Sequence, residues 1–277
     1  FIMIINIIGL PRTGTTVLYQ SVFSGINKCD MLVKRDTFLD RWDEPWIFSK
    51  QDRGNPEFIK NLSLKIDEAI ELGTTGHLVI KTHYGHLSDL KKYVPESYEK
   101  LLSVETYNIK IFRANIFDST LSNMILTKAN IEGPEKFLTV LNSAIPDMSE
   151  EQVIESIKSI SYEIDEAEFL KFFDGYIFSH CEMLRNHLNL SVDDYVLYEN
   201  LPKTIKGIWE SLKLSLDDRF KFDINDSFDV VTKKSFYSKK DLIKNYDNLH
   251  AAVSKYNGEY SSMTLTDGFW TTKVVDF

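Results

Sequence analysis

The sequence predicts an α/β protein in which helices cover both faces of a central parallel sheet, giving three layers. Short apolar segments rich in β-branched residues alternate along the chain with longer segments that have apolar residues at helical spacing. The first apolar segment, Ile2–Gly9, is continuous rather than alternating, as is typical of a strand buried on both faces. No repeat or Pro/Gly-rich linker interrupts the sequence, so we predict a single domain over residues 1–277.

Local patterns place the individual elements. After the strand Ile2–Gly9 and a Gly-rich loop, Thr15–Ser24 has apolar residues at helical spacing, and Gly25 is expected to end that helix. Ser238 and Asp241 form a capping box, which predicts a last helix running to about Tyr256. The other predicted strands are His77–His83, Asn108–Phe112 and Asp194–Tyr198, and the other predicted helices are Pro56–Leu72, Asp118–Lys128, Glu150–Ile160, Glu168–Leu188 and Pro202–Leu214.

Composition restricts the function. A formal net charge of −9 argues against a broad nucleic-acid-binding surface, although a local group of amides and cations can still hold a small anion. Cys29 and Cys181 are the only cysteines, which excludes a disulfide framework and a cysteine-based zinc site and favours a reducing compartment. We therefore expect a cytoplasmic protein that does not bind nucleic acid.

The apolar start, Phe1–Leu10, leads directly into the Gly-rich loop and lacks both a basic leader and a small-residue cleavage site. No apolar stretch approaches the ~18–20 residues needed to span a bilayer. We interpret this segment as a buried strand and expect no membrane span.

The strongest functional motif is Gly9-Leu-Pro-Arg-Thr-Gly-Thr-Thr16. It keeps the two glycines, their spacing and the final hydroxyl of the Walker A pattern G-x-x-x-x-G-K-[ST], between a predicted strand and a predicted helix. Such a loop binds phosphate or sulfate oxygens through backbone amides. However, Thr15 occupies the position of the Walker lysine, and Arg12 is the only cation in the loop.

Two more motifs follow predicted strands. Arg113 comes directly after one strand and Ser122 lies in the next helix, so a guanidinium fork and a hydroxyl are available for a phosphate group. Lys81 and His83 end another strand, where alternation places them on the same face. The carboxyl ends of parallel strands border the ligand crevice of such folds, which makes Lys81 and His83 candidates for a functional site.

Together these motifs resemble those of sulfotransferases that use 3′-phosphoadenosine 5′-phosphosulfate as donor. Pro11–Thr16 is similar to the family's 5′-phosphosulfate loop, Pro-[Lys/Arg]-[Ser/Thr]-Gly-Thr-[Thr/Ser]. Lys81–His83 matches its Lys-Thr-His motif, and Tyr198–Leu201 is similar to its Tyr-Glu-Asp-Leu motif. The family's 3′-phosphate element often has the form Arg-x-Asn-x-x-Asp-x-x-x-Ser, which is matched here by Arg113, Asn115, Asp118 and Ser122.

The resemblance implies a fold like that of P-loop NTPases and a sulfuryl transfer that requires no metal. It implies that His83 is the general base and that Lys81 and Arg12 stabilise charge on the transferring group. The expected donor-binding residues are Arg12, Thr13, Gly14, Thr15, Thr16, Arg113, Ser122 and Tyr198. The acceptor would be a hydroxyl or amine of a small molecule, glycan or peptide, and the sequence leaves its identity and the oligomeric state open.

The chain departs from the family pattern in lacking the Arg-Lys-Gly segment that adds cations to the 3′-phosphate. Lys233 and Lys234 are candidates to replace it. His83 and His86 form an H-x-x-H pattern, but no acidic pair or cysteine accompanies it, so we expect no metal site there. Two alternatives stay open: a P-loop small-molecule kinase with a degenerate Walker A loop, and a catalytically silent nucleotide-binding protein of the same fold.

Overall fold

A computed structural model of the chain describes residues 4–28, 55–73, 78–133, 136, 151, 155, 160–201, 205, 207–208, 210–211, 239–255, 263–266 and 269–272. Contacts divide the chain into two compact units, each described by itself below. The first comprises Phe1–Phe112 and Arg185–Thr232, and the second comprises Arg113–Leu184 and Lys233–Phe277. The prediction of a single domain stays a prediction.

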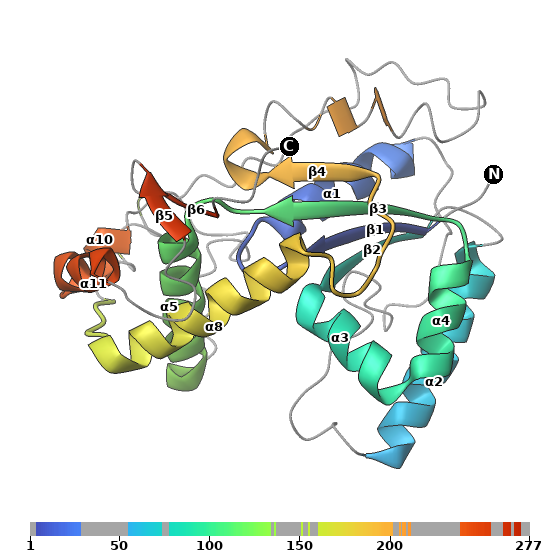
Figure 1. Cartoon of the computed structure of the whole chain (residues 1–277), viewed down its shortest axis with the longest axis horizontal. Coiled ribbons are helices and arrows are strands. Elements are labelled where there is room, and N and C mark those ends of the chain that lie inside the picture. Colours follow the sequence, from blue (N-terminus) through green and yellow to red (C-terminus); the bar gives the residue numbers. More distant parts are fainter. Residues whose placement is uncertain are drawn as a thin grey trace. The chain divides into compact units, whose positions relative to one another are not determined.

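The first unit contains a parallel sheet of four strands in the order β2-β1-β3-β4 (Figure 1). The strands are β1 (Ile4–Gly9), β2 (Leu78–His83), β3 (Thr106–Phe112) and β4 (Asp194–Leu197). All six residues of β1 are buried, as its continuous apolar sequence predicts. The predicted α/β class and parallel sheet are therefore confirmed.

Helices lie on both faces of this sheet. On one face, Leu18 and Val22 of α1 (Thr15–Lys28) belong to one buried cluster with Ile5 and Ile7 of β1. On the other face lie α3 (Tyr84–Tyr93) and α4 (Pro95–Ser103). The amphipathic helix α2 (Pro56–Gly73) packs against α4. This arrangement of helix, sheet and helix agrees with the predicted three layers.

A chain of buried polar side chains crosses the strands on the face covered by α3 and α4. Thr82 Oγ1 donates to Asn6 Oδ1 at 2.9 Å, and Asn6 Nδ2 donates to Asn108 Oδ1 at 3.2 Å. Asn108 Nδ2 in turn donates to Thr106 Oγ1 at 3.0 Å and to Ser191 Oγ at 3.2 Å. Because buried amides are costly unless they are hydrogen-bonded, these bonds stabilise the pairing of β2, β1 and β3.

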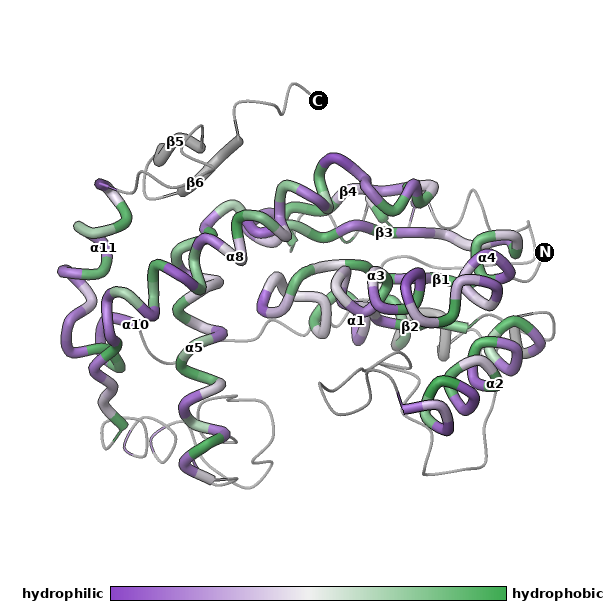
Figure 2. The backbone as a smooth tube through the Cα atoms, turned by 60° about the horizontal axis from the view of Figure 1, so that its bottom comes forward, coloured by the Kyte–Doolittle hydropathy of each residue, from purple (hydrophilic) through white to green (hydrophobic). Residues whose placement is uncertain are grey.

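The second unit is built around α5 (Ile116–Glu132) and α8 (Glu166–Leu184), which pack against each other. Hydrophobic and hydrophilic stretches alternate along α8 in Figure 2, as expected for a helix with one buried face. The short helix α10 (Lys239–Leu242) and α11 (Tyr246–Ser254) also belong to this unit. An antiparallel pair, β5 (Met263–Thr266) and β6 (Phe269–Thr272), completes its described elements.

Two helix predictions were wrong. The helix predicted to stop at Gly25 continues to Lys28, so α1 passes through this glycine. The last predicted helix is broken into α10 and α11, because Ile243 leaves the helix to form a β-bridge with Tyr162. The predicted helices Glu150–Ile160 and Pro202–Leu214 lie largely outside the described residues. Of the helices that the structure describes, none has the length and apolar character needed to cross a membrane.

Candidate functional site

The Gly-rich loop folds back tightly over the end of β1. A Cβ atom on Gly9 would lie 2.6 Å from both Thr13 Oγ1 and Thr15 Cγ2, so only glycine allows this close approach. Arg12 and Gly14 have positive φ angles, 68° and 91°. Gly14 adopts this conformation readily, whereas a left-handed Arg12 is sterically costly.

Side chains within the loop hold its shape. Thr13 Oγ1 and the Thr13 backbone N–H both donate to the carbonyl of Leu10, at 2.8 and 3.3 Å. Thr13 and Thr15 are buried, whereas Thr16 is exposed. Since α1 begins at Thr15, its first turn presents N–H groups that have no partner within the helix, and such a turn attracts anions.

A lysine from the neighbouring strand contacts the loop. Lys81 Nζ, near the carboxyl end of β2, donates a hydrogen bond to Thr16 Oγ1 at 3.0 Å. Lys81 is 6% exposed and pairs with Ile7 of β1 in the sheet. Its ammonium group therefore reaches the first turn of α1 from another strand, although Thr15 stands at the Walker lysine position.

His83 lies at the junction of β2 and α3. It is the last residue of β2, where it pairs with Gly9, and it is the residue before the first turn of α3. Its ring is partly exposed and lies 5.4 Å from the ring of His86, in an edge-to-face arrangement. Among the residues that the structure describes, no group of three His, Cys, Asp or Glu side chains could hold a metal ion.

Tyr198, which follows β4, packs against the Gly-rich loop. It begins a short 3₁₀ turn, Tyr198–Asn200, directly after β4. A Cβ on Gly14 would collide with the Tyr198 ring, lying 2.8 Å from Cε2, and would be 3.3 Å from Leu201 Cδ1. The second loop glycine is therefore required both by its φ angle and by the ring beside it.

Arg113 and Ser122 belong to the second unit. Arg113 follows directly on the last residue of β3, and its Nη2 lies 3.4 Å from Asp118 Oδ2. Asn115 caps α5, because its side chain accepts a hydrogen bond from the Asp118 backbone N–H at 2.9 Å. Ser122 is partly exposed and lies one turn after Asp118 on the same helix.

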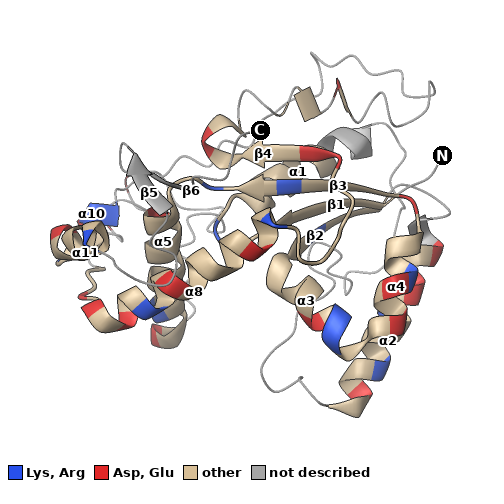
Figure 3. Ribbon diagram, viewed as in Figure 1, with Lys and Arg blue, Asp and Glu red and all other residues tan. Residues whose placement is uncertain are grey.

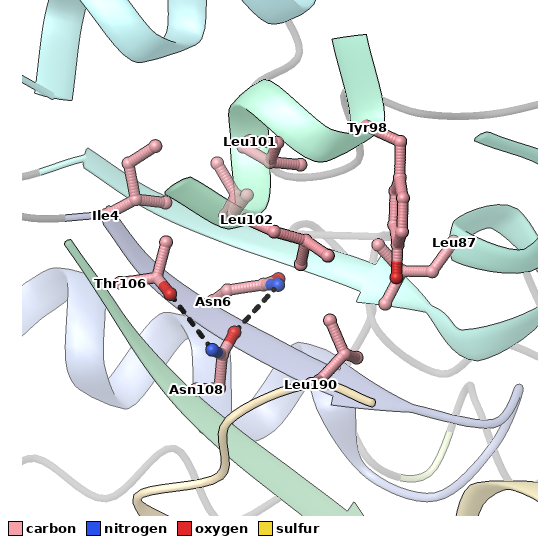
Figure 4. Close-up of a pocket in the computed structure, with 10 residues that line it drawn as sticks. Ile4, Asn6, Leu87, Tyr98, Leu101, Leu102, Thr106, Asn108 and Leu190 are labelled. Atoms are coloured by element: carbon pink, nitrogen blue, oxygen red, sulfur yellow. Dashed lines mark hydrogen bonds between the residues drawn. The ribbon is translucent and has the colours of Figure 1, made fainter. Parts of the chain in front are cut away.

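A small cavity lies away from the loop, on the face of the sheet covered by α3 and α4 (Figure 4). It is lined at the amino ends of the strands by Ile4, Asn6 and Thr106, and by Tyr98 of α4. Its volume of about 10 Å³ leaves room for roughly one water molecule. The cavity is therefore not a ligand site comparable to the loop.

A buried lysine also lies on this second face. Basic residues are blue in Figure 3, where β3 carries a blue band, and the sequence of β3 contains one basic residue, Lys110. Lys110 is fully buried and donates to Asn186 Oδ1 at 2.7 Å. Burial lowers the pKa of Lys110 to about 8. Alternation along β3 turns Lys110 away from the face on which Lys81 meets the loop, so we assign it a structural role.

The sequence-predicted residues thus divide between the two units. The predicted residues of the first unit either form the Gly-rich loop and the start of α1 or lie beside them. They are Arg12, Thr13, Gly14, Thr15, Thr16, Lys81, His83 and Tyr198. Arg113 and Ser122 are in the second unit, while Lys233 and Lys234 lie outside the described residues. Lys239, which no sequence motif singled out, has its Nζ 3.1 Å from Asp118 Oδ2. The only available signal was its place in the predicted capping box.

No protein-family model matches the sequence, and comparison with curated proteins gives no significant match.

Proposed function

We propose that this protein is a sulfotransferase with a fold like that of P-loop NTPases, and that it transfers a sulfuryl group from 3′-phosphoadenosine 5′-phosphosulfate to a hydroxyl or amine. The hydrogen bond from Lys81 Nζ to Thr16 Oγ1, at 3.0 Å, is the observation that carries the proposal. It supplies a cation to an anion-binding loop that lacks the Walker lysine. His83 pairs with Gly9, the last residue of the strand that leads into this loop, and this position also supports the proposal.

In this proposal the acceptor oxygen or nitrogen attacks sulfur as the bond from sulfur to the 5′-phosphate oxygen breaks. His83 takes the acceptor proton as general base. Lys81, Arg12 and the amides of the first turn of α1 stabilise the sulfuryl oxygens and the negative charge that forms on the leaving 5′-phosphate. The products are the sulfated acceptor and 3′-phosphoadenosine 5′-phosphate, and the proton is carried away by His83.

The proposed donor differs from ATP in two ways that concern this chain. A sulfuryl group carries less negative charge than a γ-phosphoryl group, so its transfer does not require a divalent cation. The donor also carries a 3′-phosphate, which we assign to Arg113 and Ser122, with Tyr198 near the adenine. A guanidinium group and a hydroxyl suit such a phosphate because they offer several N–H and O–H donors to its oxygens.

The acceptor in this proposal is a small molecule, glycan or peptide, and the compartment is the cytoplasm. The two alternatives make different predictions. A kinase with a degenerate loop would require ATP and Mg²⁺. A silent nucleotide-binding protein would bind 3′-phosphoadenosine 5′-phosphate but would transfer no sulfuryl group.

Calorimetric titration tests the donor first. Wild type and Arg113→Ala would be titrated with 3′-phosphoadenosine 5′-phosphate, with AMP, and with ATP and Mg²⁺. We expect wild type to prefer the nucleotide with the 3′-phosphate and Arg113→Ala to lose about tenfold in affinity for it. A preference for ATP and Mg²⁺, or indifference to the 3′-phosphate, contradicts the proposal and favours the kinase.

Turnover separates the enzyme from a silent protein. Donor labelled with ³⁵S would be incubated with pools of phenols, amines, saccharides and tyrosine peptides, and labelled products would be separated from donor. Transfer to one class, and its loss in His83→Asn, is the expected result. Tight binding without transfer to any pool would favour the silent nucleotide-binding protein.

A further inference from the structure

Polar side chains from three elements line the small cavity between the sheet and α4 (Figure 4). They are Asn6 of β1, Thr106 and Asn108 of β3, and Tyr98 of α4. Asn6, Asn108 and Tyr98 are only 5%, 3% and 0% exposed, so bulk solvent does not satisfy their polar groups. The rest of the lining is isoleucine and leucine. The cavity therefore brings buried polar side chains together in an apolar setting, where an unmade hydrogen bond is costly.

The two asparagine amides have more hydrogen-bonding groups than their mutual bond uses. Asn6 Nδ2 carries two N–H groups, and within the part of the chain that the structure describes only one has an acceptor, Asn108 Oδ1 at 3.2 Å. Asn108 Oδ1 has a second lone pair, whereas both N–H groups of Asn108 Nδ2 are used, by Thr106 and Ser191. One buried donor and one buried acceptor thus remain available where the amides line the cavity.

Tyr98 adds a hydroxyl from α4. This hydroxyl donates to the carbonyl of Leu188 at 3.3 Å, which is long beside the ~2.7–2.8 Å of most O–H···O bonds. Its oxygen can also accept a hydrogen bond. Burial raises the pKa of Tyr98 to about 12, so the hydroxyl stays protonated near neutral pH. In Figure 4 the Asn6 amide points toward this hydroxyl.

The size and the chemistry of the cavity together define what it binds. Its volume of about 10 Å³ matches a single water molecule, and a water inside a protein typically makes about three hydrogen bonds. We propose that the cavity is the binding site of one structural water, which accepts from Asn6 Nδ2 and donates to Asn108 Oδ1 and to the Tyr98 hydroxyl oxygen. The water joins α4 to β1 and β3 and extends the chain of polar side chains that links these strands.

Tyr98→Phe removes the contact on α4, and Tyr107→Phe is the matched control. Tyr107 is also buried, and its hydroxyl donates to Asp194 Oδ2 at 2.6 Å, but it lies on the face of the sheet covered by α1. Each change therefore deletes one buried phenol hydroxyl that has an acceptor of its own. Oxygen-17 magnetic relaxation dispersion would be measured for wild type and both variants, because it counts water molecules that stay inside a protein for longer than nanoseconds.

We expect the dispersion of Tyr98→Phe to fall by the contribution of about one water molecule, because the water loses one of its three partners and exchanges faster. Tyr107→Phe should match wild type. Equal dispersions for all three proteins, or equal falls in both variants, would overturn the inference.

A high-resolution crystal structure of wild type provides the second test and decides the matter if Tyr98→Phe does not fold. A water bonded to Asn6 Nδ2 and Asn108 Oδ1 supports the site, and a cavity without water overturns it. The cavity lies away from the Gly-rich loop, so either result is independent of the proposed function.

Discussion

Lys81 and Thr16 are 65 positions apart in the sequence, yet Lys81 Nζ donates a hydrogen bond to Thr16 Oγ1 at 3.0 Å. The bond joins the carboxyl end of β2 to the first turn of α1. It thus brings the ammonium group of a buried lysine to the Gly-rich loop.

Replacement of Lys81 should weaken anion binding at the loop. We expect Lys81→Met to raise the dissociation constant for 3′-phosphoadenosine 5′-phosphate about tenfold, because it removes a charge-assisted contact from a poorly solvated site. Isothermal titration calorimetry measures this change. Lys91→Met, at an exposed position in the last turn of α3, is the control and should bind as wild type does. Equal affinities for the two variants would remove Lys81 from the site.

Replacement of His83 should affect the rate rather than donor binding. With the acceptor identified by the labelled-donor screen, we expect His83→Asn to lower kcat by about 10²–10⁴-fold, the usual contribution of a general base. Its affinity for 3′-phosphoadenosine 5′-phosphate should change by less than twofold. His86→Asn is the matched control, because its ring lies only 5.4 Å from that of His83. A similar loss of rate in both variants would argue for a local structural effect.

Replacement of Gly14 should destabilise the loop. In Gly14→Ala the new methyl group meets the Tyr198 ring and the backbone must keep a φ of 91°, so we expect a loss of roughly 2–3 kcal/mol in the free energy of unfolding. Urea denaturation measures this loss. Adding Tyr198→Ala should recover part of it, because that change removes the contact but not the backbone strain.

Gly175→Ala is the control for this experiment. Gly175 lies in the interior of α8, is exposed, and has open space where a Cβ would be placed. Alanine should therefore increase the free energy of unfolding by about 1 kcal/mol, as expected for a helix interior. A Gly14→Ala variant that is as stable as wild type would contradict the packing of Tyr198 against the loop.

His180 should make the stability of the protein sensitive to acid. Burial lowers the pKa of His180 from 6.5 to about 4, so between these pH values the unfolded chain binds a proton at this position that the folded protein does not. The free energy of unfolding should therefore fall by up to about 3 kcal/mol as the pH is lowered from 6.5 to 4.

Urea denaturation at several pH values tests this effect. We expect His180→Gln to be less stable than wild type near pH 7. The difference in the free energy of unfolding should become smaller as the pH falls, because wild type loses stability through His180 and the variant does not. His187, which is exposed, provides the control, and His187→Gln should follow the wild-type profile. Parallel profiles for wild type and His180→Gln would show that this side chain does not cause the acid sensitivity.

The sequence predicts the centre of the fold well because its signals there are local. The continuous apolar run of β1, the glycines of the loop and the start of α1 follow one another directly. The predictions were wrong or incomplete where distant contacts decide. Ile243 interrupts the last helix because it pairs with Tyr162, about eighty positions earlier. The sequence analysis also missed α3 and α4, although Pro95 at the start of α4 is a recognisable helix-start signal.

The same distinction applies to the candidate site. Arg12, Lys81 and His83 could be named from motifs because each follows a strand or lies within the loop. The hydrogen bond from Lys81 to Thr16 and the contact of Lys239 with Asp118 could not, since they depend on which side chains the folded chain brings together. For Lys239, the sequence pattern indicates only a position in the first turn of a helix.

The hydrogen bonds among Thr82, Asn6 and Asn108 have a consequence for the opposite face of the sheet. Successive residues of a strand point to opposite faces, so a slip of β2 by one position would turn Lys81 and His83 away from the loop. Such a slip would also leave the buried amide of Asn6 without its partner in β2, which is energetically unfavourable. These hydrogen bonds thus fix the register of β2 from the opposite face of the sheet, and with it the positions of Lys81 and His83.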